Sequence, residues 1–249
     1  MKSAENFQTE KFLFSLFNDG ITPYKIEEKL YSVFPQSERK SEYDFKARFY
    51  DYVIGNAIYN RFVWGNSLEN YRKFCADALR SEKNGAVLDA GCGSLVFTAR
   101  AYAEYEERPV VLLDRSLAML KKGMKRLRKI KGEIPQNVVF LQADVFSLPF
   151  REESFTTVNS HGMLHLFEDT KKFLDSLNRV TARNGKMFFL VLLAEDLRGK
   201  FFTRAAKRTG EIALALNSSE MRKRIEKLGY NLQFRTAGNI GYVVIGKKY

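Results

Sequence analysis

The sequence predicts an α/β fold, in which a doubly wound and mostly parallel sheet follows a helical N-terminal segment. From residue 85 onward, short apolar runs alternate with amphipathic stretches, and two of the runs end in an aspartate. Residues 1–80 instead are rich in aromatic side chains and contain no run of β-branched residues. Strands that alternate with helices usually form a parallel sheet covered on both faces. We therefore expect a helical cap over residues 1–80 and an α/β domain over residues 81–249.

Apolar residues in the N-terminal segment recur at helical spacing. One predicted helix ends at Pro35 and rests on four such residues, Ile26, Leu30, Tyr31 and Phe34. Residues 43–80 are typical of two helices separated at Trp64-Gly65-Asn66, and either Asn66 or Ser67 can cap the second. The cap is therefore predicted to contain three to five helices.

The α/β domain is predicted to contain seven strands. Buried strands are expected over residues 86–89, 110–114, 137–141, 155–159 and 186–193, and the last of these should be central because it is the longest apolar run. Helices are expected over residues 97–105, 116–131, 170–182 and 220–228. The final strands, 230–235 and 241–247, follow each other across a short turn and should pair as an antiparallel hairpin.

A glycine-containing loop follows the first predicted strand. Gly91 and Gly93 allow a tight turn and let a ligand approach the backbone. A dinucleotide site requires a third small residue three positions after the second glycine, where this chain has Val96. The loop therefore fails the dinucleotide pattern.

Carboxylates at the strand ends indicate the charge of the ligand. Asp89 lies two residues before Gly91 and would repel a pyrophosphate, but it suits a ligand with a cationic group. S-adenosylmethionine has an ammonium and a sulfonium group and no phosphate. Asp114 ends the second strand, 25 residues after Asp89 (114 − 89), where a carboxylate can accept ribose hydroxyls.

The chain resembles the class I S-adenosylmethionine-dependent methyltransferases, particularly the small-molecule, UbiE-like branch, over roughly residues 85–249. The resemblance rests on five segments in the family's order: VLDAGCGS, VVLLD, LQADVFSLPF, SFTTVNSHGMLHLFED and RVTARNGKMFFLVLL. It implies a Rossmann-like seven-stranded sheet, S-adenosyl-L-methionine as cofactor, and methyl transfer by in-line displacement.

The resemblance also assigns roles to residues of the cofactor site. The expected cofactor-binding set is Asp89, Ala90, Gly91, Cys92, Gly93, Asp114, Arg115, Asp144, Val145, Asn159 and Ser160. Within it, Asp144 would meet the adenine amino group, the Val145 amide an adenine ring nitrogen, and the backbone of residues 159–160 the amino-acid end. The family commonly has a third glycine where this chain has Leu95, which either crowds the methionine moiety or sits on the following helix.

Few residues are candidates for the chemical step. Methyl transfer from a sulfonium mainly needs an oriented acceptor, and a general base is needed only if the acceptor must lose a proton. His161, His165 and Tyr59 are the catalytic or acceptor-side candidates, although each could instead be a packed residue. Cys92 could be a nucleophile, but no activating partner is assignable, so a small packed thiol is favoured.

Composition excludes several other classes. Two cysteines and two histidines cannot build a disulfide framework or a credible zinc site, so no metal is expected. No apolar run has the length of a membrane span and no signal peptide is evident, which predicts a cytoplasmic protein.

The net charge of +12 is compatible with two kinds of anionic partner. A basic cluster after the fifth strand favours an anionic small-molecule acceptor or surface; its members are Arg198, Lys200, Arg204, Lys207 and Arg208. The charge also suits a nucleic-acid methyltransferase, although residues 159–162 lack the two prolines of enzymes that methylate base amino groups. A non-catalytic binding module that retains the fold is the remaining alternative.

Overall fold

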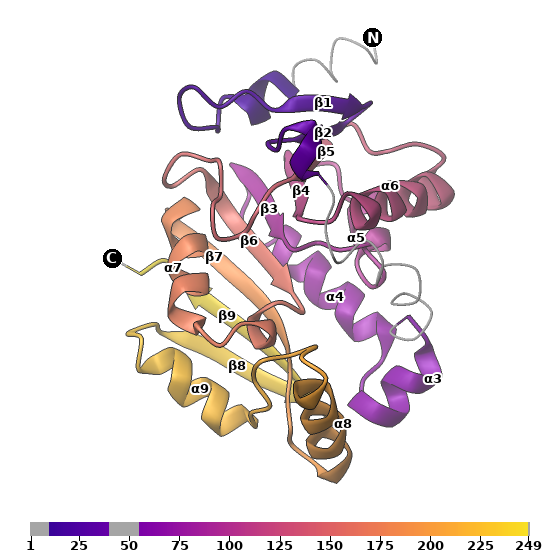
Figure 1. The fold of residues 1–249 in the computed structure, drawn as a ribbon, viewed down its shortest axis with the longest axis vertical. Coiled ribbons are helices and arrows are strands. Elements are labelled where there is room, and N and C mark those ends of the chain that lie inside the picture. The colour runs from indigo at the N-terminus through magenta and orange to yellow at the C-terminus, as the bar shows by residue number, and fades with distance from the viewer. Residues whose placement is uncertain (1–9, 40–54, 249) are drawn as a thin grey trace.

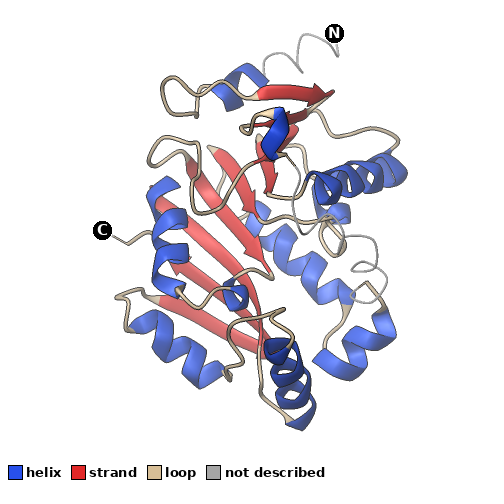
Figure 2. Cartoon of the chain, viewed as in Figure 1, coloured by secondary structure: helices blue, strands red, loops and turns tan. Residues whose placement is uncertain are grey.

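The computed structural model describes residues 10–39 and 55–248, which form a nine-stranded mixed sheet with helices on both faces (Figures 1 and 2). The strand order is β1-β2-β5-β4-β3-β6-β7-β9-β8. The predicted α/β doubly wound class is confirmed. The predicted count of seven strands is wrong, because two short strands from the N-terminal segment extend the sheet.

Five parallel strands form the centre of the sheet. They are β3 (Ala86–Ala90), β4 (Val110–Asp114), β5 (Val138–Gln142), β6 (Phe155–His161) and β7 (Thr181–Leu192). From β3 the chain builds outward through β4 and β5, and then returns to place β6 and β7 on the other side of β3. The order in which the strands are added therefore reverses between the parallel strands β3 and β6, where Asp89 is the register partner of Asn159.

The C-terminal hairpin matches its prediction. β8 (Leu232–Ala237) and β9 (Ile240–Gly246) pair antiparallel, and β9 pairs antiparallel with β7. β7 is thus an interior strand, as its long apolar run predicts.

Helices cover the two faces of the sheet separately (Figure 1). One face carries α4 (Leu68–Leu79), α5 (Ala99–Ala103) and α6 (Leu117–Lys131), and the other carries α7 (Thr170–Val180) and α9 (Ser218–Glu226). Alternation along β3 assigns Val87 to the α4–α6 side and Leu88 to the α7–α9 side. The predicted basic helix is α6, which is capped by Ser116 and buries Leu120, Met124 and Leu127 against the sheet.

The first part of the N-terminal segment contradicts the sequence prediction. The helix expected across Ile26–Phe34 is instead a strand pair, β1 (Tyr24–Glu27) and β2 (Leu30–Ser32), followed by the short helix η1 (Gln36–Glu38). Lys29 makes the turn with a φ of 61°, and its ammonium donates to the carbonyls of Pro135 and Gln136 at 2.9 Å each. β2 pairs in parallel with β5, so the unpaired backbone groups of β5 select the extended form over local helical periodicity.

The described residues of the second part of this segment, 55–80, are mostly helical, as predicted. α3 (Ala57–Tyr59) continues into η2 (Asn60–Trp64), and the chain turns at Gly65 with a φ of 61°. Ser67 then caps α4 by accepting from the Asn70 amide at 3.2 Å. The first part of the predicted helical stretch, residues 43–54 with Tyr50 and Tyr52, lies outside the described residues.

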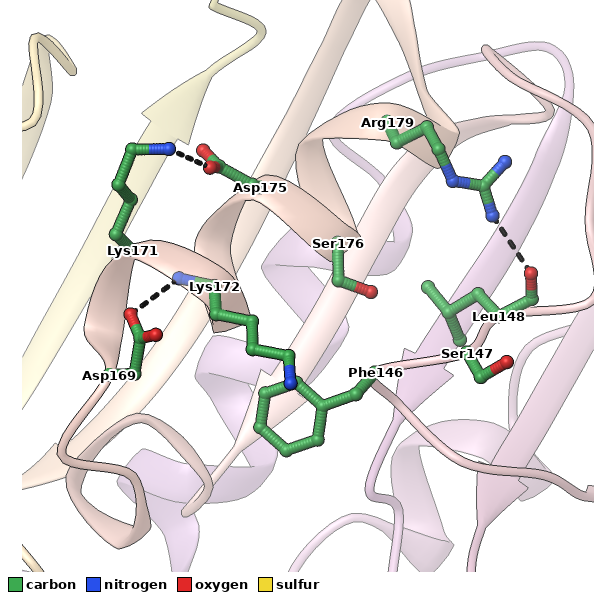
Figure 3. Close-up of a pocket in the computed structure, with 9 residues that line it drawn as sticks. All are labelled: Phe146, Ser147, Leu148, Asp169, Lys171, Lys172, Asp175, Ser176 and Arg179. Atoms are coloured by element: carbon green, nitrogen blue, oxygen red, sulfur yellow. Dashed lines mark hydrogen bonds and ion pairs between the residues drawn. The ribbon is translucent and has the colours of Figure 1, made fainter.

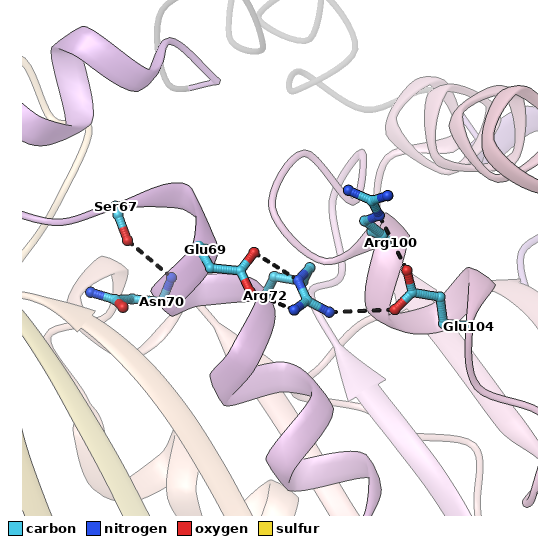
Figure 4. Close-up of polar contacts among 6 residues, drawn as sticks. All are labelled: Ser67, Glu69, Asn70, Arg72, Arg100 and Glu104. Atoms are coloured by element: carbon cyan, nitrogen blue, oxygen red, sulfur yellow. Dashed lines mark hydrogen bonds and ion pairs between the residues drawn. The ribbon is translucent and has the colours of Figure 1, made fainter.

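Polar contacts join α4 to α5 at the surface (Figure 4). Arg72 pairs with Glu69 on its own helix and reaches Glu104 after α5 at 3.4 Å, and Arg100 pairs with Glu104 at 3.1 Å. These side chains are 30% to 69% exposed, so the network is expected to contribute little stability.

Two elements after the central strands were not predicted. η3 (Leu164–Leu166) follows β6, and α8 (Leu197–Arg208) follows β7 and contains the predicted basic cluster. Asp196 caps α8 by accepting from the Gly199 amide at 2.7 Å. Across the described ranges, no helix is long and apolar enough to cross a membrane.

Candidate functional site

The carboxyl ends of β3 and β6 meet at the point where the strand order reverses, which is where open α/β sheets bind ligands. Asp89 of β3 is 1% exposed, and its Oδ2 accepts a hydrogen bond of 2.6 Å from the Tyr102 hydroxyl on α5. Asn159 of β6 is buried and donates from Nδ2 to the same hydroxyl oxygen at 3.3 Å. Tyr102 therefore links the two strand ends.

Both of these side chains retain an unused acceptor. Within the part of the chain that the structure describes, Asp89 Oδ1 and Asn159 Oδ1 are buried and have no hydrogen-bond partner. A buried acceptor without a donor costs about 1–3 kcal/mol. The pair therefore suits a ligand that presents hydrogen-bond donors, and a cationic donor suits Asp89 best.

The ionisation of Asp89 depends on its surroundings. Burial raises the pKa of its carboxyl from 3.8 to about 7, the hydrogen bond from Tyr102 opposes the rise, and the nearby Asp114 adds to it. Asp89 is thus poised between its charged and neutral forms near neutral pH. A bound cation would favour the charged form.

The glycine loop is held tightly against β4. The amides of Gly91 and Cys92 both donate to the Leu113 carbonyl, at 2.8 and 2.9 Å. Gly91 has a φ of 79°, and a Cβ there would lie 2.6 Å from Met163, so this position requires glycine. At Gly93, by contrast, a Cβ would meet nothing within 4 Å, which leaves space beside the backbone.

Cys92 and Ala90 contribute to the packing and hydrogen bonding of this loop. Burial raises the pKa of the Cys92 thiol well above its usual value, which agrees with the packed-thiol interpretation. The Ala90 carbonyl accepts from the Ser160 hydroxyl at 2.6 Å and so ties the end of β3 to β6.

Leu95 adopts a backbone conformation that usually favours glycine. Its φ is 59°, in the left-handed region, and its side chain is 1% exposed. A Cβ built on Gly123 of α6 would lie 3.2 Å from Leu95 Cγ and 3.2 Å from Phe140, so the leucine packs in the core between α6 and the sheet.

Asp114 lies at the end of β4 beside the glycine loop. Its Oδ2 accepts from the Gly93 amide and its Oδ1 from the Ser116 amide, both at 2.8 Å. The adjacent Arg115 stacks its guanidinium 3.9 Å from the Phe34 ring centroid and donates to Glu38 O, so it contacts the N-terminal segment.

The predicted adenine contacts lie after β5. Asp144 Oδ1 accepts from the Phe146 amide at 2.9 Å, which forms a local turn, and the carbonyl of buried Val145 accepts from the Ser176 hydroxyl. A groove of about 660 Å³ opens next to this turn, on the outer side of α7 (Figure 3). Its lining, which includes Lys172, Asp175 and Arg179, contains none of the expected cofactor residues.

The three catalytic candidates lie on separate elements. His161 ends β6 with its ring centroid 5.7 Å from that of Phe74, and both ring nitrogens are buried without a partner among the described residues. Burial lowers the pKa of His161 from 6.5 to about 3, so its ring is neutral at physiological pH. Tyr59 instead packs against Trp64 and Phe202, each with a centroid separation of 6.4 Å.

His165 has the contacts of a packed residue. It is 3% exposed, and its Nδ1 accepts from the Leu192 amide at 3.3 Å. Its carbonyl accepts from the amides of Ala213 and Leu214 at 3.0 Å each. Burial lowers its pKa to about 3, and its geometry supports the loop after β6 rather than a proton transfer.

The structure thus brings Asp89, Asn159, Asp114 and the glycine loop together, whereas Tyr59 packs against Trp64 and Phe202. Sequence reasoning missed Tyr102 and Phe74, which contact the site from α5 and α4. Tyr102 lies in a predicted helix, but its contact with Asp89, 13 residues earlier, could not be predicted because it depends on how α5 packs on β3.

Comparisons with known proteins agree with this geometry. Residues 81–192 match a methyltransferase domain family. The ubiquinone/menaquinone biosynthesis C-methyltransferase UbiE of Cronobacter sakazakii is 31% identical over 121 residues, which are 48% of this chain and 47% of that protein. The first curated relatives are matched over 31% to 47% of their own length.

Solved structures share the fold at low sequence identity. A putative S-adenosyl-L-methionine-dependent methyltransferase from Methanococcus maripaludis covers 86% of this chain and 98% of its own, with a TM-score of 0.57 and 15% identity. The [4+2]-cyclase SpnF covers 82% and 92%, with a TM-score of 0.60 and 12% identity.

The chain folds as a Rossmann-like α/β domain with a candidate ligand site at the switch point of its sheet. The sequence matches identify residues 81–192 as a methyltransferase domain, and the chain as a whole shares its fold with a putative S-adenosyl-L-methionine-dependent methyltransferase.

Proposed function

We propose that the protein transfers the methyl group of S-adenosylmethionine to a small-molecule acceptor. The observation that carries the proposal is the pair of buried, unused acceptors on Asp89 and Asn159 beside the glycine loop. A ligand with ammonium and hydroxyl donors would satisfy both. When bound, S-adenosylmethionine supplies a methyl group that is already activated on a sulfonium.

The residues of this chain would bind and orient the reactants. Asp89 would hold the ammonium group and Asp114 the ribose hydroxyls, with its carboxylate already fixed by the Gly93 and Ser116 amides. The turn at Asp144 and Val145 would contact the adenine. These roles agree with the charge and hydrogen-bonding capacity of the side chains.

His161 would orient the acceptor by hydrogen bonding. With a pKa of about 3, its imidazole is a weak base, so it accepts a hydrogen bond more readily than it removes a proton. We therefore favour an acceptor that reacts without strong base assistance.

The acceptor is assigned to the small molecules on two grounds. The curated relatives include proteins named as ubiquinone/menaquinone C-methyltransferases, although they match only about half of this chain or less. The loop after β6 also lacks the two prolines of base-amino methyltransferases. The basic cluster on α8 is solvent-exposed, so it supports an anionic surface better than an anionic acceptor.

The fold alone does not decide the reaction, because a cyclase shares it. Calorimetric titration with S-adenosylmethionine tests the cofactor, with Asp114→Ala and Asp89→Asn as site variants and Asp77→Asn, an exposed residue on α4, as control. We expect binding by wild type and the control and a loss of at least about tenfold in each site variant. No binding at millimolar cofactor would overturn the proposal, and unchanged affinity in Asp114→Ala would remove the ribose assignment.

Turnover with labelled donor distinguishes the remaining functions. A binding module would bind the cofactor without release of S-adenosylhomocysteine, and a nucleic-acid enzyme would label RNA or DNA but not small-molecule extracts.

We also propose the cytoplasm as the site of action, since Cys75 and Cys92 are free thiols. Cell fractionation tests this assignment.

A further inference from the structure

Helix α8 and the continuous α3–η2 segment lie at the end of the molecule opposite β1 (Figure 1). Four large apolar side chains on these elements are exposed. On α8, Leu197 is 85% and Phe201 68% exposed, and on α3 and η2, Ile58 is 79% and Phe62 62% exposed. Single exposed apolar residues are ordinary, but these four lie on elements in direct contact. Arg198 of α8 donates to the Phe62 carbonyl at 3.0 Å, and its guanidinium lies 5.3 Å from the Phe62 ring centroid. We call these four residues and the exposed cations of α8 the α8–η2 surface.

Cations alternate with the apolar side chains on this surface. A shallow groove is lined by one row of residues four apart, Leu197, Phe201 and Ala205, and by a second row, Lys200, Arg204 and Arg208. Residues 197–208 contain no aspartate or glutamate. Within residues 10–39 and 55–248, no ion pair neutralises Lys200, Arg204 or Arg208, whereas Arg198 has Asp196 at 3.7 Å.

This combination fits a lipid surface better than a folded protein. Protein interfaces place apolar residues in a core that is depleted in lysine and confine charges to the rim. Here the apolar and cationic rows run side by side along one helix, so apolar tips can enter the acyl boundary while the cations meet phosphates. We propose that the α8–η2 surface docks the protein onto a membrane surface rich in anionic phospholipid. This inference does not depend on methyl transfer.

The test uses flotation of the full chain with vesicles of phosphatidylcholine, alone or mixed with phosphatidylglycerol. We expect binding only to the anionic vesicles, and weaker binding as salt is raised. The double variant Leu197→Ser/Phe201→Ser should weaken partitioning by roughly tenfold or more, because two apolar side chains no longer enter the lipid. Lys200→Glu/Arg204→Glu should reduce binding to the level seen with phosphatidylcholine alone.

A matched control comes from α6, which is also strongly basic but buries its apolar face. Ile130 is 46% exposed there and is followed and preceded by lysines and arginines. Ile130→Ser/Lys129→Glu makes one apolar and one charge change on that helix and should leave vesicle binding unchanged. All substituted residues are exposed, so circular dichroism should show native folding in every variant.

Trp64, the single tryptophan of the chain, gives a second readout. Its ring is 6.5 Å from Phe202, whose ring is 5.4 Å from that of Phe201. Lipids brominated in the upper acyl chain should quench its fluorescence in wild type and in the α6 control, but not in Leu197→Ser/Phe201→Ser. The proposal is overturned if wild type does not bind anionic vesicles, as expected for an acidic protein partner, or if the α8 variants bind and quench like wild type.

Discussion

The Tyr102 hydroxyl donates a 2.6 Å hydrogen bond to Asp89 Oδ2, and both side chains are buried. Burial raises the pKa of Asp89 to about 7, and this donor is the one influence that lowers it. The packing of α5 on β3 therefore sets the charge of the carboxylate at the start of the glycine loop. The proposed cofactor site requires that carboxylate to be ionised, so a helix contact controls ligand affinity.

Replacing Tyr102 should shift the pH dependence of cofactor binding. Tyr102→Phe removes the donor, raises the pKa of Asp89 further, and should move the half-maximal affinity for S-adenosylmethionine upward by about one to two pH units. Calorimetric titrations between about pH 6 and pH 9 measure the shift. Tyr105→Phe, whose hydroxyl contacts Arg108 instead, is the matched control and should keep the wild-type profile. An unmoved profile in Tyr102→Phe would contradict the assigned role of Asp89.

Asp89 should also reduce the stability of the cofactor-free protein at neutral pH. Its carboxyl has an ordinary pKa of 3.8 when unfolded but keeps its proton up to about pH 7 in the fold. The folded state then binds more protons across this window, so the free energy of unfolding falls as pH rises from about 4 to about 7. Asp89→Asn should therefore increase stability at pH above 7 by on the order of a few kcal/mol, while cofactor binding is lost. Urea unfolding at acidic and alkaline pH checks this, and equal stability of the two proteins above pH 7 would refute it.

The buried histidines should change the free energy of unfolding with pH in the opposite direction to Asp89. Burial lowers the pKa of both His161 and His165 from 6.5 to about 3. The unfolded chain then binds more protons below pH 6.5, so the stability that they contribute is lost as pH falls from 6.5 toward 3. His165→Asn retains an acceptor for the Leu192 amide but does not titrate, and its unfolding free energy should depend less on pH in this window than that of wild type. Identical pH slopes would show that His165 protonates freely in the folded state.

Leu95→Gly should separate backbone strain from packing. The glycine relieves a left-handed φ that costs a leucine about 1–2 kcal/mol, but it removes a core side chain worth about 2–5 kcal/mol. We expect a net loss of stability by thermal unfolding and a cofactor affinity within about twofold of wild type, because the side chain packs against α6. A large gain in affinity would show instead that Leu95 crowds the cofactor.

Arg108 should contribute strongly to the free energy of unfolding. It is 2% exposed and donates to the Leu79 carbonyl at 2.6 Å, the Tyr105 hydroxyl at 2.8 Å and the Thr157 hydroxyl at 3.0 Å. Arg108→Met leaves these buried oxygens without a donor and should cost about 3–5 kcal/mol of unfolding free energy. Arg100→Met, with a side chain 69% exposed, should change stability by less than about 1 kcal/mol. Similar denaturant midpoints for both variants would count against this role.

The α/β domain could be read from sequence because its signals are local. Buried strands such as β3 and β4 are continuous apolar runs, each bounded by an aspartate, and α6 has a complete apolar stripe with Ser116 as its cap. The same local signals located the loop at Gly91 and Gly93 and the carboxylates of Asp89 and Asp114. These residues follow directly from strand ends, so their meeting at one edge of a parallel sheet was predictable.

Only tertiary structure decided the remaining features. Residues 24–32 have helical periodicity, yet they are strands because the edge of β5 offers unpaired backbone groups that a helix could not satisfy. The Tyr102–Asp89 contact and the burial of Leu95 under α6 likewise join residues whose proximity no local pattern encodes. Sequence thus determined the class of fold and the acids of the site, while packing determined their pKa values, the extent of the sheet and the exposed α8–η2 surface, because burial and edge pairing depend on partners distant in the chain.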